Sequence, residues 1–230
     1  MRNSIIFLIG IIIKNILLLL ENPDVIHFPQ MLRGIDFQCT AYQVALQFFE
    51  FMLYSYFFYG EASRYITNGG LYTLIRERSR KRMVIRIMGE LGQKLLYIKL
   101  FDLLSYCCFC FIVSGCKVSV PLTQICCSFV RNYIVFFVLL NMQIWIELWF
   151  NSQVSILASG IYFISAIMIG SYMYLWSIPR WIYIFLFINL AFDARYDRID
   201  YGAYLLCFVI FISIIINYIL LQKTKKKDFM

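Results

Sequence analysis

Long apolar runs alternate with short polar intervals along the whole chain. A helix needs about 20 predominantly apolar residues to cross a bilayer, and a run of this kind occurs repeatedly here. The expected fold class is an all-α integral membrane protein whose residues 1–230 form a single transmembrane domain. The pattern predicts six transmembrane helices, at residues 4–20, 41–60, 96–115, 122–150, 154–176 and 201–221.

One apolar run is too short for this scheme. Residues 181–192 number only 12, and they lie between Pro179 and Asp193. Such a piece does not span a bilayer comfortably, so we expect a re-entrant or interfacial segment on the outer side, before the last span. Trp176 and Trp181 would then lie at the membrane interface. If the segment crossed, the last helix would run in the opposite direction.

The first apolar run resembles a secretory signal, because Arg2 precedes it. However, Lys14 interrupts its core, and no small-x-small cleavage site follows Leu20. A retained first transmembrane helix is therefore expected.

The composition supports a membrane protein. Apolar residues make up 62% of the chain and charged residues 15%, and the mean hydropathy is +0.74. About six spans would use most of the chain, which leaves no room for a separate soluble domain. The net charge of +8 arises from basic residues that flank the spans. This placement favours anionic lipid or a protein partner and argues against nucleic acid.

The basic residues also indicate the orientation. Eight of them lie between Arg64 and Lys94, in the predicted loop 61–95. With six spans and the N-terminus inside, the inner side holds thirteen basic residues and the outer side five. Because basic residues stay on the cytoplasmic side, the expected location is the cell membrane, multi-pass, with both termini cytoplasmic.

Two charges lie near the middle of predicted spans. Lys14 belongs to the first span and Glu50 to the second. An intramembrane charge costs about 2.5–3.5 kcal/mol on insertion scales, so both side chains should face the interior and each other. The alternative, left open, is a snorkelling Lys14 and a Glu50 that faces water. If the two residues pair, exchanging their charges should restore expression lost in either single variant.

Catalytic and metal-binding interpretations find little support. The chain has eight cysteines, but Cys107, Cys108, Cys110, Cys126 and Cys127 fall within or beside spans and are expected to pack as small apolar residues. Zinc would need histidine partners or CxxC pairs in a polar setting, and the chain offers neither. A disulfide between Cys39 and Cys116 is left open.

The remaining candidates for chemistry are few. His27 is the only histidine and is expected in a solvated loop. The charges from Asp193 to Asp200 are expected to form a solvated outer loop of mutually paired groups. No Gly-x4-Gly-Lys-Ser/Thr loop occurs, so this chain is not expected to be an enzyme or to hydrolyse ATP itself.

The loop between the second and third spans has a more specific pattern. A turn signal at Asn68-Gly69-Gly70 precedes a short apolar and basic stretch, and Ser79 is placed to cap a new helix. In that helix Met83, Val84, Ile87, Met88, Leu91 and Leu95 recur on one face, whereas Arg80, Arg82 and Arg86 take the other. We expect an amphipathic helix on the inner surface that leads into the third span. An ordinary positively charged flank is the alternative.

With this loop, the chain resembles the permease subunits of ABC exporters of the six-helix type-2 class. The closest resemblance is to small permeases of Gram-positive peptide or bacteriocin export and immunity systems. In that class the loop between helices two and three has a similar "G…L-I-R-x-x-S-R" look and forms the coupling helix. The short re-entrant piece before the last helix is also a feature of the class. The family often has an amphipathic helix before the first span, whereas only Met1 to Asn3 precede it here.

The resemblance implies a function and a set of partners. The chain would be the permease subunit of an ATP-driven exporter that moves a peptide, bacteriocin or other amphipathic or lipid-like cargo. Its partners would be a second permease copy or sister permease, membrane lipid and a separate ATP-binding subunit, which would hold the ATP and Mg. The residues expected at the ATPase contact are Leu74, Ile75, Arg76, Ser79, Arg80, Arg82 and Arg86.

A non-transporting membrane protein is the main alternative. It would be an immunity or sensor subunit that binds a toxin or partner. The two readings differ in their expected gene neighbours. A neighbouring gene that encodes a Gly-x4-Gly-Lys-Ser/Thr loop favours the permease, and a neighbouring kinase or lone toxin gene favours the alternative.

Overall fold

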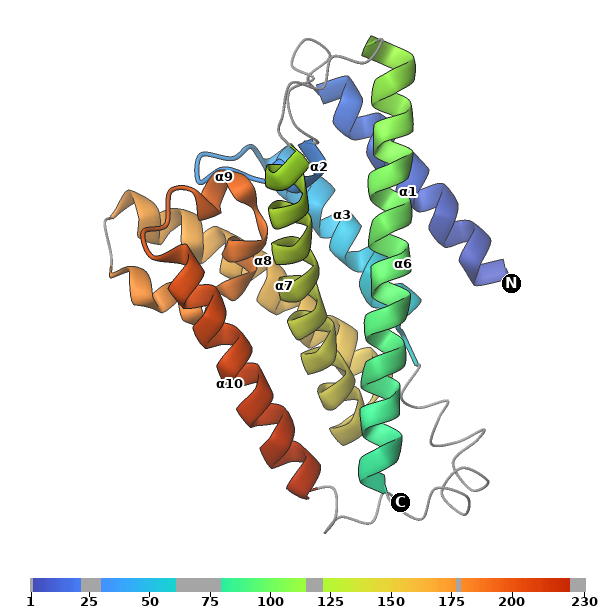
Figure 1. Cartoon of the computed structure of the whole chain (residues 1–230), viewed down its shortest axis with the longest axis vertical. Helices are drawn as coiled ribbons and strands as arrows, with labels where there is room; N and C mark the ends of the chain where they lie inside the picture. Colours follow the sequence, from blue (N-terminus) through green and yellow to red (C-terminus); the bar gives the residue numbers. More distant parts are fainter. Residues whose placement is uncertain (1, 22–29, 61–79, 115–121, 177–178, 224–230) are drawn as a thin grey trace.

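A computed structural model of the chain describes residues 2–21, 30–60, 80–114, 122–176 and 179–223, and every regular element in these ranges is a helix (Figure 1). The α-helices are α1 (Arg2–Glu21), α2 (Gln30–Arg33), α3 (Ala41–Phe57), α6 (Arg80–Ser114), α7 (Leu122–Trp149), α8 (Ser152–Leu175), α9 (Asp193–Tyr196) and α10 (Gly202–Lys223). Two short 3-10 helices, η1 (Arg180–Ile184) and η2 (Phe187–Ala191), lie between α8 and α9.

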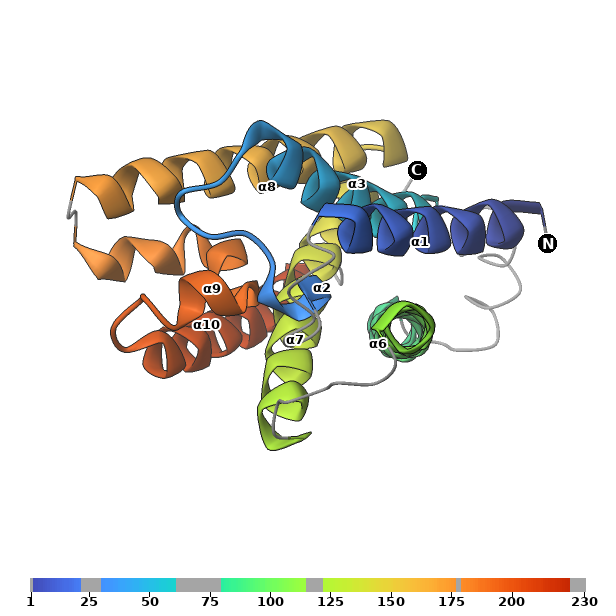
Figure 2. The same ribbon diagram turned by 90° about the horizontal axis from the view of Figure 1, so that it is seen from above.

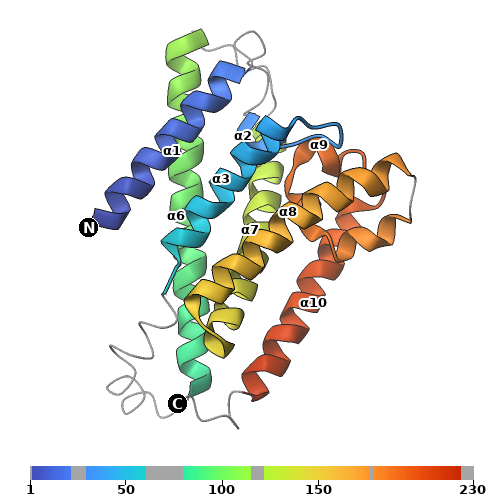
Figure 3. The same cartoon turned by 180° about the vertical axis from the view of Figure 1, so that it is seen from behind.

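The long helices form two layers. Seen from above, α1, α3 and α8 lie in one layer, and α6, α7 and α10 lie in the other (Figure 2). Seen from behind, α1, α3 and α8 cross in front of the second layer (Figure 3). Consecutive long helices run in opposite directions, so α6 starts at the same end of the molecule at which α3, α7 and α10 finish (Figure 1).

Four helices are long and apolar enough to cross a membrane, judged by length and composition. They are Val84–Ile112 within α6, the whole of α7 and α8, and Gly202–Gln222 within α10. Each of these four overlaps a predicted span, although Val84–Ile112 starts twelve residues before the predicted span 96–115. In the two other predicted spans, α1 has an apolar stretch of 14 residues, Phe7–Leu20, and α3 has 17 residues in all. The protein is therefore an all-α chain with the features of a multi-pass membrane protein.

The predicted surface helix before the third span is wrong in one respect. The structure has one uninterrupted helix, α6, of 35 residues rather than an amphipathic helix followed by a separate span. At 1.5 Å per residue it is about 52 Å long, well beyond the roughly 30 Å of a bilayer core. The expected apolar face does exist, because Val84, Ile87, Leu91 and Leu95 are buried against the rest of the protein. These contacts hold the first turns of α6 against the bundle.

Local signals explain where two of the helices begin. Thr40 Oγ1 accepts a hydrogen bond from the Gln43 backbone N–H, and Gln43 Oε1 accepts one from the Thr40 N–H, both at 3.3 Å. This reciprocal capping box satisfies two backbone donors at the start of α3. At the start of α8, Asn151 Oδ1 accepts from the Val154 N–H at 2.7 Å.

The core at the centre of the two layers is rich in aromatic rings. Phe51 of α3 stacks on Phe163 of α8 with ring centroids 4.6 Å apart. Tyr54 meets the edge of Phe136 of α7 at 5.6 Å. All four residues are fully buried. Offset and edge-on ring pairs stabilise a core beyond the area that they bury, so α3, α7 and α8 are fixed to one another here.

The segment between α8 and α10 folds back onto the bundle and does not cross it. Two small residues of α8 allow this close approach, as small residues do between membrane helices. Asn189 donates to the Ala166 carbonyl oxygen at 3.0 Å, and Tyr183 Oη donates to the Gly170 carbonyl oxygen at 3.0 Å. A Cβ at position 170 would overlap the Asn189 side chain. The predicted helical piece is present as two 3-10 helices rather than an α-helix, and its re-entrant placement in a membrane stays a prediction.

Gly34, just after α2, lies against the segment between α8 and α10. Its φ is +63°, a conformation that favours glycine, and a Cβ there would overlap the ring of Phe192. The chain from α2 to α3 therefore lies directly on the segment that precedes α10.

Candidate functional site

Four charged side chains meet where α1, α3 and α6 touch. Lys14 Nζ lies 2.6 Å from Asp102 Oδ2 and 3.6 Å from Glu50 Oε2. Lys99 Nζ lies 2.9 Å from Glu50 Oε1. None of the four side chains is exposed, and we call them the buried charge network. Two cations face two carboxylates, so the network is electrically neutral.

Neutral polar groups complete the environment of Asp102. Tyr54 Oη donates to Asp102 Oδ2 at 2.6 Å, and Asn15 Nδ2 donates to Asp102 Oδ1 at 3.1 Å. Asn15 also donates to Ser105 Oγ at 2.7 Å. A buried carboxylate is costly unless its oxygens accept hydrogen bonds, and both oxygens of Asp102 do so.

Aromatic rings extend the network to α7. Lys99 Nζ lies 3.8 Å from the ring centroid of Phe136 and 4.4 Å from that of Tyr54. The faces of these rings are electron-rich and attract a desolvated ammonium group. Lys99 is thus held by a carboxylate from α3 and by a ring from each of α3 and α7.

The structure brings together the two intramembrane residues predicted from the sequence, Lys14 and Glu50, but their main partners are others. Each forms its shortest ion pair with a residue of α6, Asp102 and Lys99 respectively. Sequence reasoning missed these two, although their spacing of three residues places them on one helix face. A carboxylate at position 14 would lie against Asp102, so exchanging Lys14 and Glu50 alone is no longer expected to restore expression.

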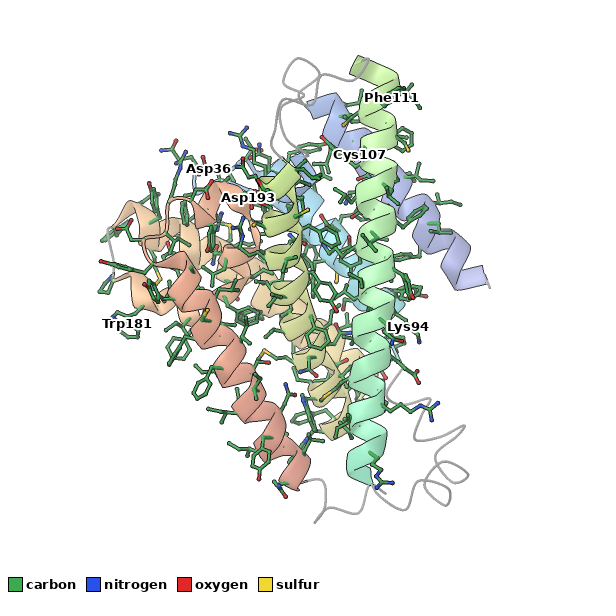
Figure 4. The ribbon with its side chains drawn as sticks, viewed as in Figure 1. Asp36, Lys94, Cys107, Phe111, Trp181 and Asp193 are labelled. Carbon is green, nitrogen blue, oxygen red and sulfur yellow. The ribbon has the colours of Figure 1, made fainter. Side chains whose placement is uncertain are left out.

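Of the predicted ATPase-contact residues, the structure describes only those in α6. Arg80 is the first residue of that helix. Arg82 is exposed, and Arg86 is exposed and pairs with Glu90 at 3.1 Å. Both arginines lie on the part of α6 that precedes Lys94, at the lower end of the view in Figure 4. The other predicted contact residues lie outside the described residues; they are Leu74, Ile75, Arg76 and Ser79.

A second buried polar group lies near the opposite end of the molecule. Arg195 of α9 is fully buried. Burial lowers the pKa of its guanidinium to about 10, so the group is still charged at neutral pH. Its N–H groups donate to uncharged oxygens on three separate segments: the carbonyl oxygens of Ile35 (3.1 Å), Asp36 (3.0 Å) and Ile167 (3.0 Å), Ser171 Oγ (2.8 Å) and Asn189 Oδ1.

The expectation of a solvated outer loop from Asp193 to Asp200 is therefore wrong in part. Asp197, Arg198 and Asp200 are exposed, as expected. Asp193 and Arg195 are buried, because the 3-10 turns before them direct the chain inward. Asp193 accepts a hydrogen bond from Ser128 at 2.5 Å and pairs with Arg131 of α7, and Arg198 pairs with Asp36 at 2.7 Å. Figure 4 shows Asp36 and Asp193 close to the start of α7.

The cysteines contribute no cluster in the described part of the chain. Cys39 and the cysteines of α6, α7 and α10 form no disulfide there, and no group of three or more metal-ligating side chains occurs among the residues described. Cys116 and His27 lie outside the described residues, so a disulfide from Cys39 to Cys116 stays an open prediction.

The comparisons with known proteins place the chain by sequence. Residues 6–230 match the model of a family described as protein of unknown function, DUF2705. The chain belongs to this family. No curated protein and no solved structure matches it. Membership of the DUF2705 family carries no activity with it, so a function has to be argued from the residues and their arrangement.

Proposed function

We propose that this DUF2705 protein is the membrane-spanning permease subunit of an ATP-driven ABC exporter. Its cargo would be a peptide, a bacteriocin or another amphipathic or lipid-like molecule that leaves the cell or the membrane. The protein would lie in the cell membrane with six crossings and both termini in the cytoplasm. ATP and Mg would be bound by a separate ATP-binding subunit.

The observation that carries this proposal is the course of the chain between α8 and α10. Residues 179–199 leave the end of α8, turn inward through η1 and η2, and return to the same end before α10 begins (Figure 1). A short re-entrant piece before the last of six helices is a feature of the type-2 exporter class that the sequence resembles. The alternating directions of α1, α3, α6, α7, α8 and α10 also suit six crossings.

The first turns of α6 support the proposed docking side. Arg82 and Arg86 are exposed there, at the end of the molecule where α10 also ends, just before the lysines of the C-terminus. Basic residues gathered at one end favour that end as cytoplasmic. Arginine forms charge-assisted, directional hydrogen bonds with carboxylates, which suits a contact with the ATPase.

A second permease is needed in this proposal. One cavity lies between α7 and α10, with residues of α8 and the 3-10 turns at its margin, and a smaller one lies near Phe101. Both are mostly apolar and do not resemble a hydrophilic passage. The translocation route would therefore lie between two copies, or between this chain and a sister permease. Nucleotide-driven closure of two ATPases would push the paired loops together and shift the helices between two discrete packings.

The proposed topology gives a direct prediction. Single cysteines introduced at Ser79 and at Lys227, in a cysteine-free variant, should react with a membrane-impermeant maleimide only from the cytoplasmic side. The measurement compares intact cells with inverted vesicles. Labelling of position 227 from outside would mean that residues 181–192 cross the membrane, and the six-span proposal would then fail.

The proposed ATPase contact gives another prediction. In the double variant Ile75→Asp with Arg76→Glu, the copurified ATP-binding subunit should fall about tenfold or more, which corresponds to a loss of at least 1.4 kcal/mol of binding free energy. Stimulated ATP turnover should be lost with it. Membrane insertion should stay intact, because seven basic residues still mark the loop as cytoplasmic.

A charge-matched variant controls for this experiment. Lys226→Glu with Lys227→Gln makes the same total change of three charge units in the C-terminal cluster and should leave the ATPase attached. If the loop variant retains the ATPase at wild-type stoichiometry, the segment from Leu74 to Arg86 is an ordinary positive flank. If no ATPase copurifies even with the wild-type chain, the permease proposal itself is contradicted.

A further inference from the structure

A cavity of about 320 Å³ lies between α7 and α10, with residues of α8 and the 3-10 turns at its margin. No charged side chain lines it, and its walls are mostly apolar, with Val138 and Met142 on α7 and Val209, Ile212 and Ile216 on α10. We call this cavity the α7–α10 groove.

Polar contacts close one end of the groove. Asn217 Oδ1 on α10 accepts hydrogen bonds from Asn141 Nδ2 at 2.9 Å and from Trp145 Nε1 at 2.6 Å, both on α7. The opposite end is formed by the aromatic residues Phe185 and Phe187 of the 3-10 segment. The groove is therefore closed at one end by hydrogen bonds between α7 and α10 and at the other by aromatic side chains. These contacts fix the separation of the two helices.

The depth of the groove follows from the aromatic residues around the start of α10. Tyr201 and Tyr204 are exposed there, as are Trp176 and Trp181, and Trp181 lies at the outer margin of the molecule in Figure 4. Exposed Trp and Tyr residues mark the membrane interface. Val209 and Asn217 follow Tyr204 by five and thirteen residues, which places them about 8 and 20 Å deeper along the helix. The groove thus lies at the depth of lipid acyl chains.

The size of the groove restricts its occupant. All of the space between its walls, the open part included, is about 850 Å³. Along the nine residues from Val209 to Asn217, about 12 Å of helix, this gives a mean cross-section of roughly 70 Å². A helix 10–12 Å across has a cross-section of about 80–110 Å². A helix of a second copy or of a peptide cargo therefore does not fit, whereas one extended hydrocarbon chain does.

We propose that the α7–α10 groove binds one acyl chain of a bilayer phospholipid. The chain would enter from the proposed outer leaflet, pass between Met142 and Val209, and end near Asn217. It would fill the space beside α10, whose described contacts are mainly with η1, η2 and α6. This site rests on the proposed placement in the membrane but not on transport, because α7 and α10 enclose the groove within one chain.

The test uses the purified full chain in vesicles of phosphatidylethanolamine and phosphatidylglycerol that contain a phospholipid with a diazirine in one acyl chain. After irradiation, the labelled residues are mapped by mass spectrometry. Groove residues Met142, Val209 and Ile212 should carry several-fold more label than Phe211 and Ile215, which are exposed on α10 and do not line the groove.

Variants test whether the label reports the groove. Met142→Trp should reduce labelling of Val209 and Ile212 several-fold by filling the groove, whereas Val130→Trp, at an exposed position of α7 outside it, should not. If Met142→Trp is not monodisperse, Ser213→Leu adds a smaller group to the same groove.

Equal labelling of groove residues and outward-facing residues would overturn the proposal, and so would labelling that groove filling leaves unchanged. Either result would mean that the label reports ordinary surrounding lipid. Crosslinks between two copies through Val209 would also overturn the proposal. No ATPase is present, so the result is separate from the transport proposal.

Discussion

Replacing Asp102 by leucine should destabilise the protein by about 3–5 kcal/mol, the usual cost of removing one partner from a buried ion pair. Asp102 accepts from Lys14, Tyr54 and Asn15 at 2.6–3.1 Å. Without it, two buried ammonium groups would share one carboxylate, Glu50. The measurement is the thermal unfolding midpoint of the detergent-solubilised protein, with size-exclusion chromatography as the readout of folded protein. The midpoint should fall by many degrees.

A second change should reverse much of this loss. In Asp102→Leu combined with Lys14→Met, the network again holds one cation and one carboxylate, Lys99 and Glu50. Replacing a complete buried pair by apolar groups is often neutral or stabilising. Glu90→Gln is the matched control, because it removes an exposed ion pair with Arg86 that is worth a few tenths of a kcal/mol. If the double variant is no more stable than Asp102→Leu, charge balance is not what the network provides.

Replacing Arg195 by methionine should also have a large effect, a loss of about 3 kcal/mol or more. The side chain volume is roughly kept, but five oxygens lose their donor, three of them on buried residues, and an unsatisfied buried acceptor costs about 1–3 kcal/mol when it cannot relax. Arg195→Lys should recover little, since one ammonium group cannot reach acceptors on three segments. Two measurements report the effect. They are the thermal unfolding midpoint of the protein and the resistance of the segment before α10 to protease.

Arg198 provides the comparison for that experiment. It lies three residues further on, is exposed, and pairs with Asp36 at 2.7 Å. Arg198→Met should cost less than about 1 kcal/mol, as exposed ion pairs usually do. Similar losses at Arg195 and Arg198 would contradict the importance of the buried guanidinium.

The sequence indicated the helices well because each apolar run is bounded by polar or turn residues. The predicted spans at 122–150 and 154–176 differ from α7 and α8 by only one or two residues at either end. The short run 181–192 was also set apart from the predicted spans, because 12 residues are too few to cross a bilayer as a helix. Period and length are local properties, and local properties can be read from one chain.

The polar interior was only partly predictable. Lys14 and Glu50 were visible because each interrupts an apolar run, but Lys99 and Asp102 were not predicted to join them. The reason is that α6 carries charged residues from Arg80 onward, so its charged middle resembles a basic flank in sequence. Arg195 was missed because its acceptors are mainly backbone carbonyls on distant segments, which leave no side-chain pattern to read. Which helix faces meet is a tertiary property, and hydropathy does not encode it.

The unbroken course of α6 has a mechanical consequence. Lys99 and Asp102 fix the helix to α1 and α3 partway along its length, and their ion pairs oppose rotation about the helix axis. A tilt of α6 would therefore pivot at this point. The arm from Arg82 to Asp102 is about 30 Å and the arm from Asp102 to Ser114 about 18 Å. If the basic end of α6 moved sideways, the end at Ser114 would therefore move in the opposite direction. Its displacement would be about three-fifths as large.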